Sequence, residues 1–268
     1  QNTTVNLDAT GQATITASDI NNGSTDNTQI ASLTVSPNAF TCANLGDNTV
    51  TLTITDPYGN TSTGTATVTV TDATLPTITA PAAITQTLTS GCSVTGLDLG
   101  TPVTADNCTV ASVTNNAPTT FPLGTTTVTW TVTDAAGNTA TATQTVTITD
   151  EINPTITAPA AITVPTNNDC FAVNVILGTP VTEDNCSVAS VTNNAPTTFP
   201  LGTTTVTWTV VDGSGNTATA TQIVTVEDNE LPTIVAPIAI NTTTNTGCTR
   251  TDLVLGNPVT NDNCTVAS

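Results

Sequence analysis

An internal repeat of 78 residues constrains this chain more than any other feature. The tripeptide Asp-Asn-Cys occurs three times, ending at Cys108, Cys186 and Cys264, so that successive copies lie 78 residues apart. The 23 residues 110–132 also recur unchanged at 188–210. Self-similarity at a fixed period is typical of tandem arrays in which each copy forms one structural unit. The sequence therefore predicts a divergent unit at 1–72, full units at 73–150 and 151–228, and a partial unit at 229–268.

The two outer units are expected to be incomplete. The last one stops after its Asp-Asn-Cys turn, where the strands that complete a core should begin, and half a sandwich would leave an open sheet edge. The first unit shares with the others the turn Asp-x-x-Gly-Asn, at 56–60, and the closing strand at 65–72, whereas its upstream half differs. We expect a variant sandwich truncated at its N-terminus, and a window of 268 residues from a longer polymer.

Threonine alternates with aliphatic residues along the segments that should form strands, such as 125–133 and 139–149. A period of two is typical of half-buried strands, and a β-branched hydroxyl residue suits a solvated sheet face because its χ1 is already restricted. Val128, Trp130 and Val132 share one face of their segment, which we predict to be core. No stretch has helical periodicity, so the predicted fold class is all-β.

The unit at 73–150 is predicted to be a two-layer sandwich. An edge strand is expected between Pro76 and Pro81, where a missing backbone donor is tolerated. In the Asp-x-x-Gly-Asn turn, glycine and asparagine are expected to supply positive φ. Further strands are predicted at 84–89, 92–99, 109–114, 125–133 and 139–149. Successive sandwiches joined by short proline-bearing linkers are expected to form an extended rod.

The charge balance excludes several classes of function. The chain has 20 acidic residues and one basic residue, Arg250, with no histidine, which gives a net charge of −19. Nucleic acid is excluded as a partner because a phosphate backbone demands clustered lysine and arginine. Anionic membrane surfaces are disfavoured for the same reason, and no apolar run is long enough to insert into a bilayer. We predict no enzyme and no catalytic residue, because acid-base chemistry would fall to carboxylates spread over repeated turns.

Seven cysteines at regular positions indicate an oxidising, extracellular compartment. A disulfide would stabilise the small core of each unit. The repeated spacing of 16 residues predicts pairs within units, with bonds between successive units, such as Cys108 to Cys170, as the alternative. For the seventh cysteine, Cys42, we expect either a partner upstream of the chain or a free thiol. The predicted pairs are Cys92 with Cys108, Cys170 with Cys186, and Cys248 with Cys264.

The segment FPLGTTTVTWTVTDAAGNTATATQTVTITD, followed by a proline-bearing linker and then Asp-Asn-Cys, resembles the HYR (hyalin repeat) domain. The resemblance covers both full units and the partial one. It implies an immunoglobulin-like (Ig-like) or fibronectin-III-like sandwich of an extracellular adhesion protein, without catalytic residues. The first unit is similar to variant Ig-like repeats that accompany HYR units in giant surface adhesins of Bacteroidetes-type bacteria, including those linked to gliding.

In an Ig-like unit the first strand, the Asp-Asn-Cys turn and the Asp-x-x-Gly-Asn hairpin should share the pole that faces the preceding unit. Thirteen of the 20 acidic residues lie near such junctions. Hard cations such as Ca²⁺ take oxygen ligands, whereas the alternative is that these aspartates cap turns. We predict that no cofactor is required and hypothesise Ca²⁺ at the junctions. The candidate ligands are Asp72, Asp106, Asp134, Asp150, Glu151, Asp184, Asp212, Asp228, Glu230 and Asp262.

These features favour a structural segment of an extracellular fibre or stalk that extends a distal binding tip from a cell surface. The expected partners are neighbouring repeats of the same chain, other fibre chains in lateral association, and a surface or host glycan or protein at the tip. In the alternative, the repeats themselves bind carbohydrate or protein. Tyr58 is the one candidate for an exposed aromatic residue, although we expect it to pack on its own unit. A threonine face at 141–149 also allows the weaker hypothesis of ice binding.

Overall fold

The computed structural model describes residues 1–265, and the chain divides into two compact units. Unit 1 contains residues 1–88 and 93–149, and unit 2 contains residues 89–92 and those from 150 onward. The predicted all-β class is confirmed, since the described helices are limited to α1 (Ala17–Ile20) and the 3-10 turn η1 (Cys42–Asn44). No helix among residues 1–265 is long and apolar enough to cross a membrane.

The first repeat of unit 1 forms a four-stranded sheet in the order β1-β6-β5-β3, with a second, two-stranded layer β2-β4. The N-terminal strand β1 pairs in parallel with the last strand β6, whereas β5 and β6 form a long antiparallel hairpin. Leu7, Ile20, Phe40, Val50 and Val68 lie in the core between the layers. The strands are β1 (Thr3–Asn6), β2 (Gln12–Thr14), β3 (Ser32–Ser36), β4 (Ala39–Thr41), β5 (Gly46–Thr55) and β6 (Thr61–Thr71).

The second repeat of unit 1 has a four-stranded sheet in the order β11-β13-β14-β8, faced by the strand pairs β10-β7 and β12-β9. Its first sheet strand, β8, again runs parallel to its last one, β14. The strands are β7 (Thr77–Thr79), β8 (Ile84–Thr87), β9 (Ser93–Thr95), β10 (Val103–Ala105), β11 (Val110–Asn115), β12 (Thr120–Pro122), β13 (Gly124–Asp134) and β14 (Thr139–Thr149).

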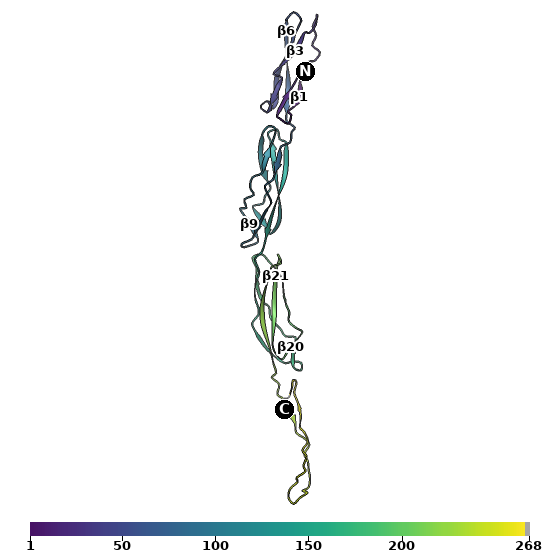
Figure 1. The fold of residues 1–268 in the computed structure, drawn as a ribbon, viewed down its shortest axis with the longest axis vertical. Helices are drawn as coiled ribbons and strands as arrows, with labels where there is room; N and C mark the ends of the chain where they lie inside the picture. Colours follow the sequence, from purple (N-terminus) through teal and green to yellow (C-terminus); the bar gives the residue numbers. More distant parts are fainter. Residues whose placement is uncertain (266–268) are drawn as a thin grey trace. The chain divides into compact units, whose positions relative to one another are not determined.

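Unit 2 repeats this topology, with the sheet β16-β22-β21-β19 and the pairs β15-β18 and β17-β20. Figure 1 shows the long strand β21 in green beside β20 of the same repeat. A further pair, β23-β24, belongs to the partial repeat. The strands are β15 (Thr155–Thr157), β16 (Ile162–Pro165), β17 (Phe171–Val173), β18 (Val181–Glu183), β19 (Val188–Asn193), β20 (Thr198–Pro200), β21 (Gly202–Asp212), β22 (Thr217–Glu227), β23 (Thr233–Val235) and β24 (Val259–Asn261).

The core of the second repeat follows the predicted alternation. Val128, Trp130 and Val132 of β13 are buried, while the intervening threonines are exposed or half-buried. Gln144 of β14, which the hydrophobic pattern did not identify, is also buried. Its Oε1 accepts a hydrogen bond of 3.1 Å from Trp130 Nε1, and its Nε2 donates to the carbonyl oxygens of Ala82 and Leu99. The amide is therefore satisfied without water and ties β14 to the segment before β8 and to the segment between β9 and β10.

The predicted edge strand between the two prolines, β7, and the five further strands predicted in the second repeat are present. Two short strands, β10 and β12, were not predicted. Such three-residue strands carry too little alternation to stand out in a sequence. At the β13–β14 turn only Gly137 has positive φ, at 93°. Asn138 instead donates from its backbone and its side chain to the Asp134 carboxylate. The expectation that asparagine also supplies positive φ was wrong, because its amide caps the turn.

Candidate functional site

Disulfide bonds connect consecutive repeats. In unit 1, Cys42 of the first repeat pairs with Cys108 of the second, with a Cα–Cα distance of 5.5 Å. In unit 2, Cys92, in the loop at 89–92, pairs with Cys186. The third bond joins Cys170 to Cys264, and Cys248 is free and exposed. Each described Asp-Asn-Cys turn is therefore bonded to a cysteine of the repeat before it.

The predicted pairing within single repeats was wrong for all three pairs. In the second repeat, the segment between Cys92 and Cys108 contains β9 and β10. Cys108 pairs with the preceding repeat, whereas Cys92 pairs with the following one. A segment of 16 residues can extend to about 55 Å, so short spacing in sequence does not imply proximity. Cys42 has its partner within the chain, contrary to expectation. The alternative, bonds between successive repeats, is confirmed, although the example given for it, Cys108 with Cys170, is not one of the observed pairs.

The sequence did contain a signal for the observed pairing. Cys92 with Cys186 and Cys170 with Cys264 share a separation of 94 residues, which is one repeat of 78 plus the spacing of 16. Both pairing schemes leave one cysteine over, Cys42 in the predicted scheme and Cys248 in the structure. Counting cysteines therefore could not decide between them.

Thiol labelling should distinguish the two pairings directly. We expect a maleimide to modify one thiol per unreduced, denatured chain, and peptide mapping to place it on Cys248. Disulfide-linked peptides should join Cys42 to Cys108. Labelling of Cys42, or a linked peptide that joins Cys92 to Cys108, would contradict the structure.

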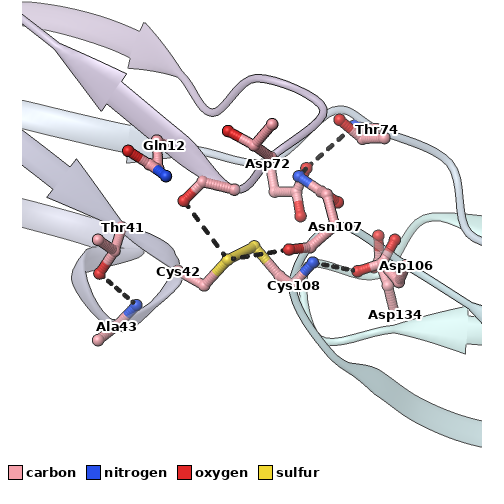
Figure 2. The surroundings of a disulfide bond; sticks show 12 residues. Gln12, Thr41, Cys42, Ala43, Asp72, Thr74, Asp106, Asn107, Cys108 and Asp134 are labelled. Carbon is pink, nitrogen blue, oxygen red and sulfur yellow. Dashed lines mark hydrogen bonds between the residues drawn. A yellow bond between two sulfur atoms is a disulfide. The ribbon is translucent and has the colours of Figure 1, made fainter.

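The junction within unit 1 is also held by close polar contacts (Figure 2). Asn107, next to the disulfide, donates from Nδ2 to the backbone oxygen of Asp8 in the first repeat, at 3.1 Å. The same amide donates to Oδ1 of Asp72 in the linker, at 3.2 Å. A Cβ added to Gly11 would lie 2.7 Å from the Asn107 carbonyl oxygen, so the turn of the first repeat approaches the disulfide as closely as glycine allows.

Three carboxylates meet beside this disulfide. Asp72 comes from the linker, Asp106 from the Asp-Asn-Cys turn and Asp134 from the end of β13, and one oxygen of each lies within 4.8 Å of the others. Figure 2 shows these three residues gathered with Asn107 around the junction. Asp72 and Asp134 are buried, and Asp106 is half-buried. The predicted convergence of linker, turn and hairpin carboxylates at one pole is therefore confirmed for this junction.

Unit 2 contains the same arrangement, built from Asp150, Asp184 and Asp212, again with one oxygen of each within 4.8 Å of the others. Asn185 takes the place of Asn107 and donates to the Gly91 carbonyl oxygen and to Oδ1 of Asp150. Two copies that differ in surrounding sequence thus form the same cluster.

A third group in the partial repeat contains only two carboxylates, Asp228 and Asp262, together with Cys264. The sulfur of Cys264 is committed to its disulfide with Cys170. The remaining two predicted ligands, Glu151 and Glu230, are exposed and belong to none of the groups found among residues 1–265. The structure therefore places eight of the ten candidate residues in clusters and leaves these two glutamates in solvent.

Turn capping, the alternative reading of these aspartates, accounts for part of the geometry. Asp106 Oδ2 accepts from the backbone of Cys108, and Asp134 accepts from Asn138. In the second copy, burial opposes ionisation of Asp212, but hydrogen bonds from Asn216 and from the backbone of Ser214 outweigh it, and the pKa of Asp212 lies below its ordinary value. The carboxylate is therefore ionised at neutral pH.

Capping leaves a second set of buried oxygens without partners. In unit 1 these are Oδ2 of Asp72, Oδ1 of Asp106 and Oδ1 of Asn107. The equivalent three atoms in unit 2 are also unpartnered, namely Oδ2 of Asp150, Oδ1 of Asp184 and Oδ1 of Asn185. In the partial repeat, Oδ1 of Asn263 is buried and unpartnered as well. Sequence reasoning did not identify the asparagines, although Asp-Asn-Cys recurs in all three copies.

The aromatic residues do not form a repeated binding surface. Trp130 and Trp208 are buried, as predicted. Tyr58 is 81% exposed, so the expectation that it packs on its own unit was wrong, because its turn projects from the end of the β5–β6 hairpin. The equivalent turn positions in the next two repeats are Ala136 and Ser214.

The chain belongs to the HYR domain family, whose model matches residues 71–148 and 149–226. A search of curated proteins found no match. Among solved structures, the chain is similar to a protocadherin gammaB7 EC3-6 cis-dimer structure, with 15% identity, 72% of this chain and 61% of that chain covered, and a TM-score of 0.33.

Two further similar structures are of extracellular regions. The protocadherin gammaB4 extracellular domain is 17% identical, with 72% of this chain and 40% of that chain covered and a TM-score of 0.35. The human desmocollin-1 ectodomain is 16% identical, with 72% and 50% covered and a TM-score of 0.29. This chain thus spans 40% to 61% of these three structures.

Proposed function

We propose that this chain is a tension-bearing segment of an extracellular fibre or stalk, in which HYR repeats separate a distal binding tip from its anchor. The observation that carries the proposal is the overlap of the three disulfides. Each bond begins before the previous one ends in sequence, because Cys92 precedes Cys108 and Cys170 precedes Cys186. The three disulfides and the backbone segments 92–108 and 170–186 between them therefore form a second continuous covalent path from Cys42 to Cys264, in addition to the backbone itself.

This covalent path is much shorter than the backbone. Between Cys42 and Cys264 the backbone contains 222 residues (264 minus 42), which extend to about 770 Å. The path through the disulfides uses only the segments 92–108 and 170–186, of 16 residues each, which together extend to about 110 Å. The hairpins β13–β14 and β21–β22, which hold the core tryptophans, lie outside it. Tension applied to the ends would thus be carried by the disulfide path and would not unfold the hairpins that form the cores.

An extracellular location supports the proposal, since three disulfides are stable in oxidising compartments and rare in reducing ones. The proposed partners are the neighbouring repeats, other chains of the fibre in lateral association, and a surface or host glycan or protein at the tip. The near-identity of the two full repeats supports the further proposal that the whole protein is a giant surface adhesin of the Bacteroidetes type.

Single-molecule force spectroscopy on the chain, held by handles at its two ends, tests the proposal. We expect the oxidised chain to reach its limiting length without unfolding steps of a full repeat, because the disulfides prevent the cores from contributing length. After reduction, each full repeat should release on the order of 270 Å of contour, less its folded length.

The matched control is Cys248→Ser, which removes the free thiol and should leave the force–extension trace unchanged. A Cys92→Ser/Cys186→Ser variant should lengthen the oxidised chain at one junction only. Full-length unfolding steps in the oxidised, unmodified chain would overturn the proposal.

A further inference from the structure

We infer that the two three-carboxylate clusters each bind one Ca²⁺ ion. Acidic groups that gather in a solvated turn need no ion, so the inference depends on what is buried at these sites. Asp72 is only 8% exposed, and its Oδ2 has no hydrogen-bond partner. Asp150, in the equivalent position, is 7% exposed and its Oδ2 is likewise unpartnered. A buried carboxylate oxygen without a partner is destabilising unless another group, such as a cation, compensates it.

The free oxygens belong to side chains whose other arm is already anchored. In unit 1, Asp72 Oδ1 accepts from the Thr74 backbone, and Asp106 Oδ2 accepts from the Cys108 backbone. Asn107 donates from Nδ2 to Asp8, which fixes its amide with Oδ1 unpartnered. These three free oxygens are therefore held in place without a ligand, as a preorganised site requires. Unit 2 has the same free atoms, so the arrangement is not an accident of one turn.

The protein supplies no positive charge of its own to these sites. Its only basic side chain, Arg250, forms an ion pair of 2.7 Å with Asp252, and the chain contains neither lysine nor histidine. Three carboxylates within 4.8 Å repel one another unless a cation or a proton separates them.

The donor set selects the kind of cation. The carboxylate and amide oxygens are hard ligands, and the adjacent sulfur of Cys108 is in a disulfide and does not offer a thiolate. Zinc and copper prefer sulfur or imidazole, whereas Ca²⁺ binds six to eight oxygens at flexible geometry. Three carboxylates and one amide from linker, turn and hairpin match this chemistry, with water or backbone oxygen completing the shell. Mg²⁺ demands a stricter octahedron and is expected to bind more weakly.

Ca²⁺ at these positions would link three segments that otherwise meet only through hydrogen bonds. In unit 1 the ligands come from the linker and the second repeat, while Asn107 also contacts the first repeat. Binding is thus expected to order the junction beside the disulfide. The inference does not rest on the proposed function, because an ion can bind whether or not the chain carries tension.

Isothermal titration of the full, oxidised, chelator-stripped chain with CaCl₂ tests the inference. We expect two equivalents of Ca²⁺, with dissociation constants in the range of about 10⁻⁴ to 10⁻³ M that is typical of extracellular modules. Asp106→Asn should reduce the stoichiometry to one, because asparagine keeps a turn-capping oxygen and removes the charge. Asp184→Asn should do the same in unit 2. Asp98→Asn, the control, removes an exposed turn-capping carboxylate outside the clusters and should leave two equivalents.

Hydrogen exchange on the unmodified chain gives a readout that needs no variant. Adding Ca²⁺ in place of chelator should slow exchange in the turns at 104–109 and 182–187, and should leave the turn around Asp98 unchanged. No measurable binding at about 5 mM Ca²⁺ would overturn the inference, as would two full equivalents in the folded Asp106→Asn variant. Binding of Mg²⁺ without binding of Ca²⁺ would overturn the assignment of the ion.

Discussion

Replacing Trp130 with alanine should destabilise the second repeat by about 3 to 5 kcal/mol. The indole is only 6% exposed, on the core face of β13, so the change leaves a large cavity that a small sandwich cannot close by collapsing. It also leaves Oε1 of the buried Gln144 without the hydrogen bond that Trp130 donates. An unsatisfied buried amide oxygen adds to the cost of the cavity.

Native-state hydrogen exchange measures this effect within one molecule. Exchange in β13 and β14 should accelerate by about two to four orders of magnitude in Trp130→Ala, since each 1.4 kcal/mol corresponds to a factor of ten. Peptides from β21 and β22 serve as an internal control, because that repeat keeps the equivalent pair Trp208 and Gln222. A second control, Thr127→Ala, changes an exposed residue of β13 and should alter exchange little. Exchange in β13 that is unchanged in Trp130→Ala would contradict the assigned core.

Removing the first disulfide should cost about 4 kcal/mol in the chain-entropy model, because the bond closes a loop of 66 residues. The double variant Cys42→Ser/Cys108→Ser avoids new free thiols. With a denaturant dependence of about 1 to 3 kcal/mol per M of urea, the unfolding midpoint of unit 1 should fall by roughly 1 to 4 M. Pulse proteolysis across a urea gradient, with fragments identified by mass spectrometry, assigns the loss to unit 1.

Cys248→Ser is the matched control, since it makes the same chemical change at a free and exposed thiol. Its midpoint should equal that of the unmodified chain. The observed pairing would be contradicted if Cys248→Ser lowered the midpoint as far as the double variant does, or if the double variant unfolded at an unchanged urea concentration.

Much of the candidate site could be predicted from the sequence, although two of the predicted ligands lie outside it. The linker, turn and hairpin aspartates were expected at a common pole, and Asp72, Asp106 and Asp134 do meet there. Asp-x-x-Gly-Asn and Asp-Asn-Cys are local turn signals whose positions follow from strand order. By contrast, Glu230, two residues after Asp228, is exposed, and Glu151, directly after Asp150, is exposed as well. Adjacent residues of an extended segment face opposite ways, which accounts for Glu151, and proximity in sequence alone did not show this.

The role of the asparagines could not be read from composition. Asn107 and Asn185 each use one amide nitrogen to join two segments, and each keeps an oxygen buried without a partner. Whether an amide oxygen is free depends on every polar group around it, and those groups come from segments as far apart as Asp8 and Asn107. A buried glutamine such as Gln144 was missed for the same reason, since its backbone partners, Ala82 and Leu99, are 62 and 45 residues away in sequence.

The sequence by itself determined the period, the long strands and their faces, because alternation of threonine with aliphatic residues is a local property that each long strand carries along its own length. Only the tertiary structure decided which cysteines bond. Spacing in sequence measures the length of chain between two residues, whereas a disulfide needs their Cα atoms about 5 Å apart. Because the segment between Cys92 and Cys108 contains two strands and ends beside different neighbours, its two cysteines bond to the repeats on either side.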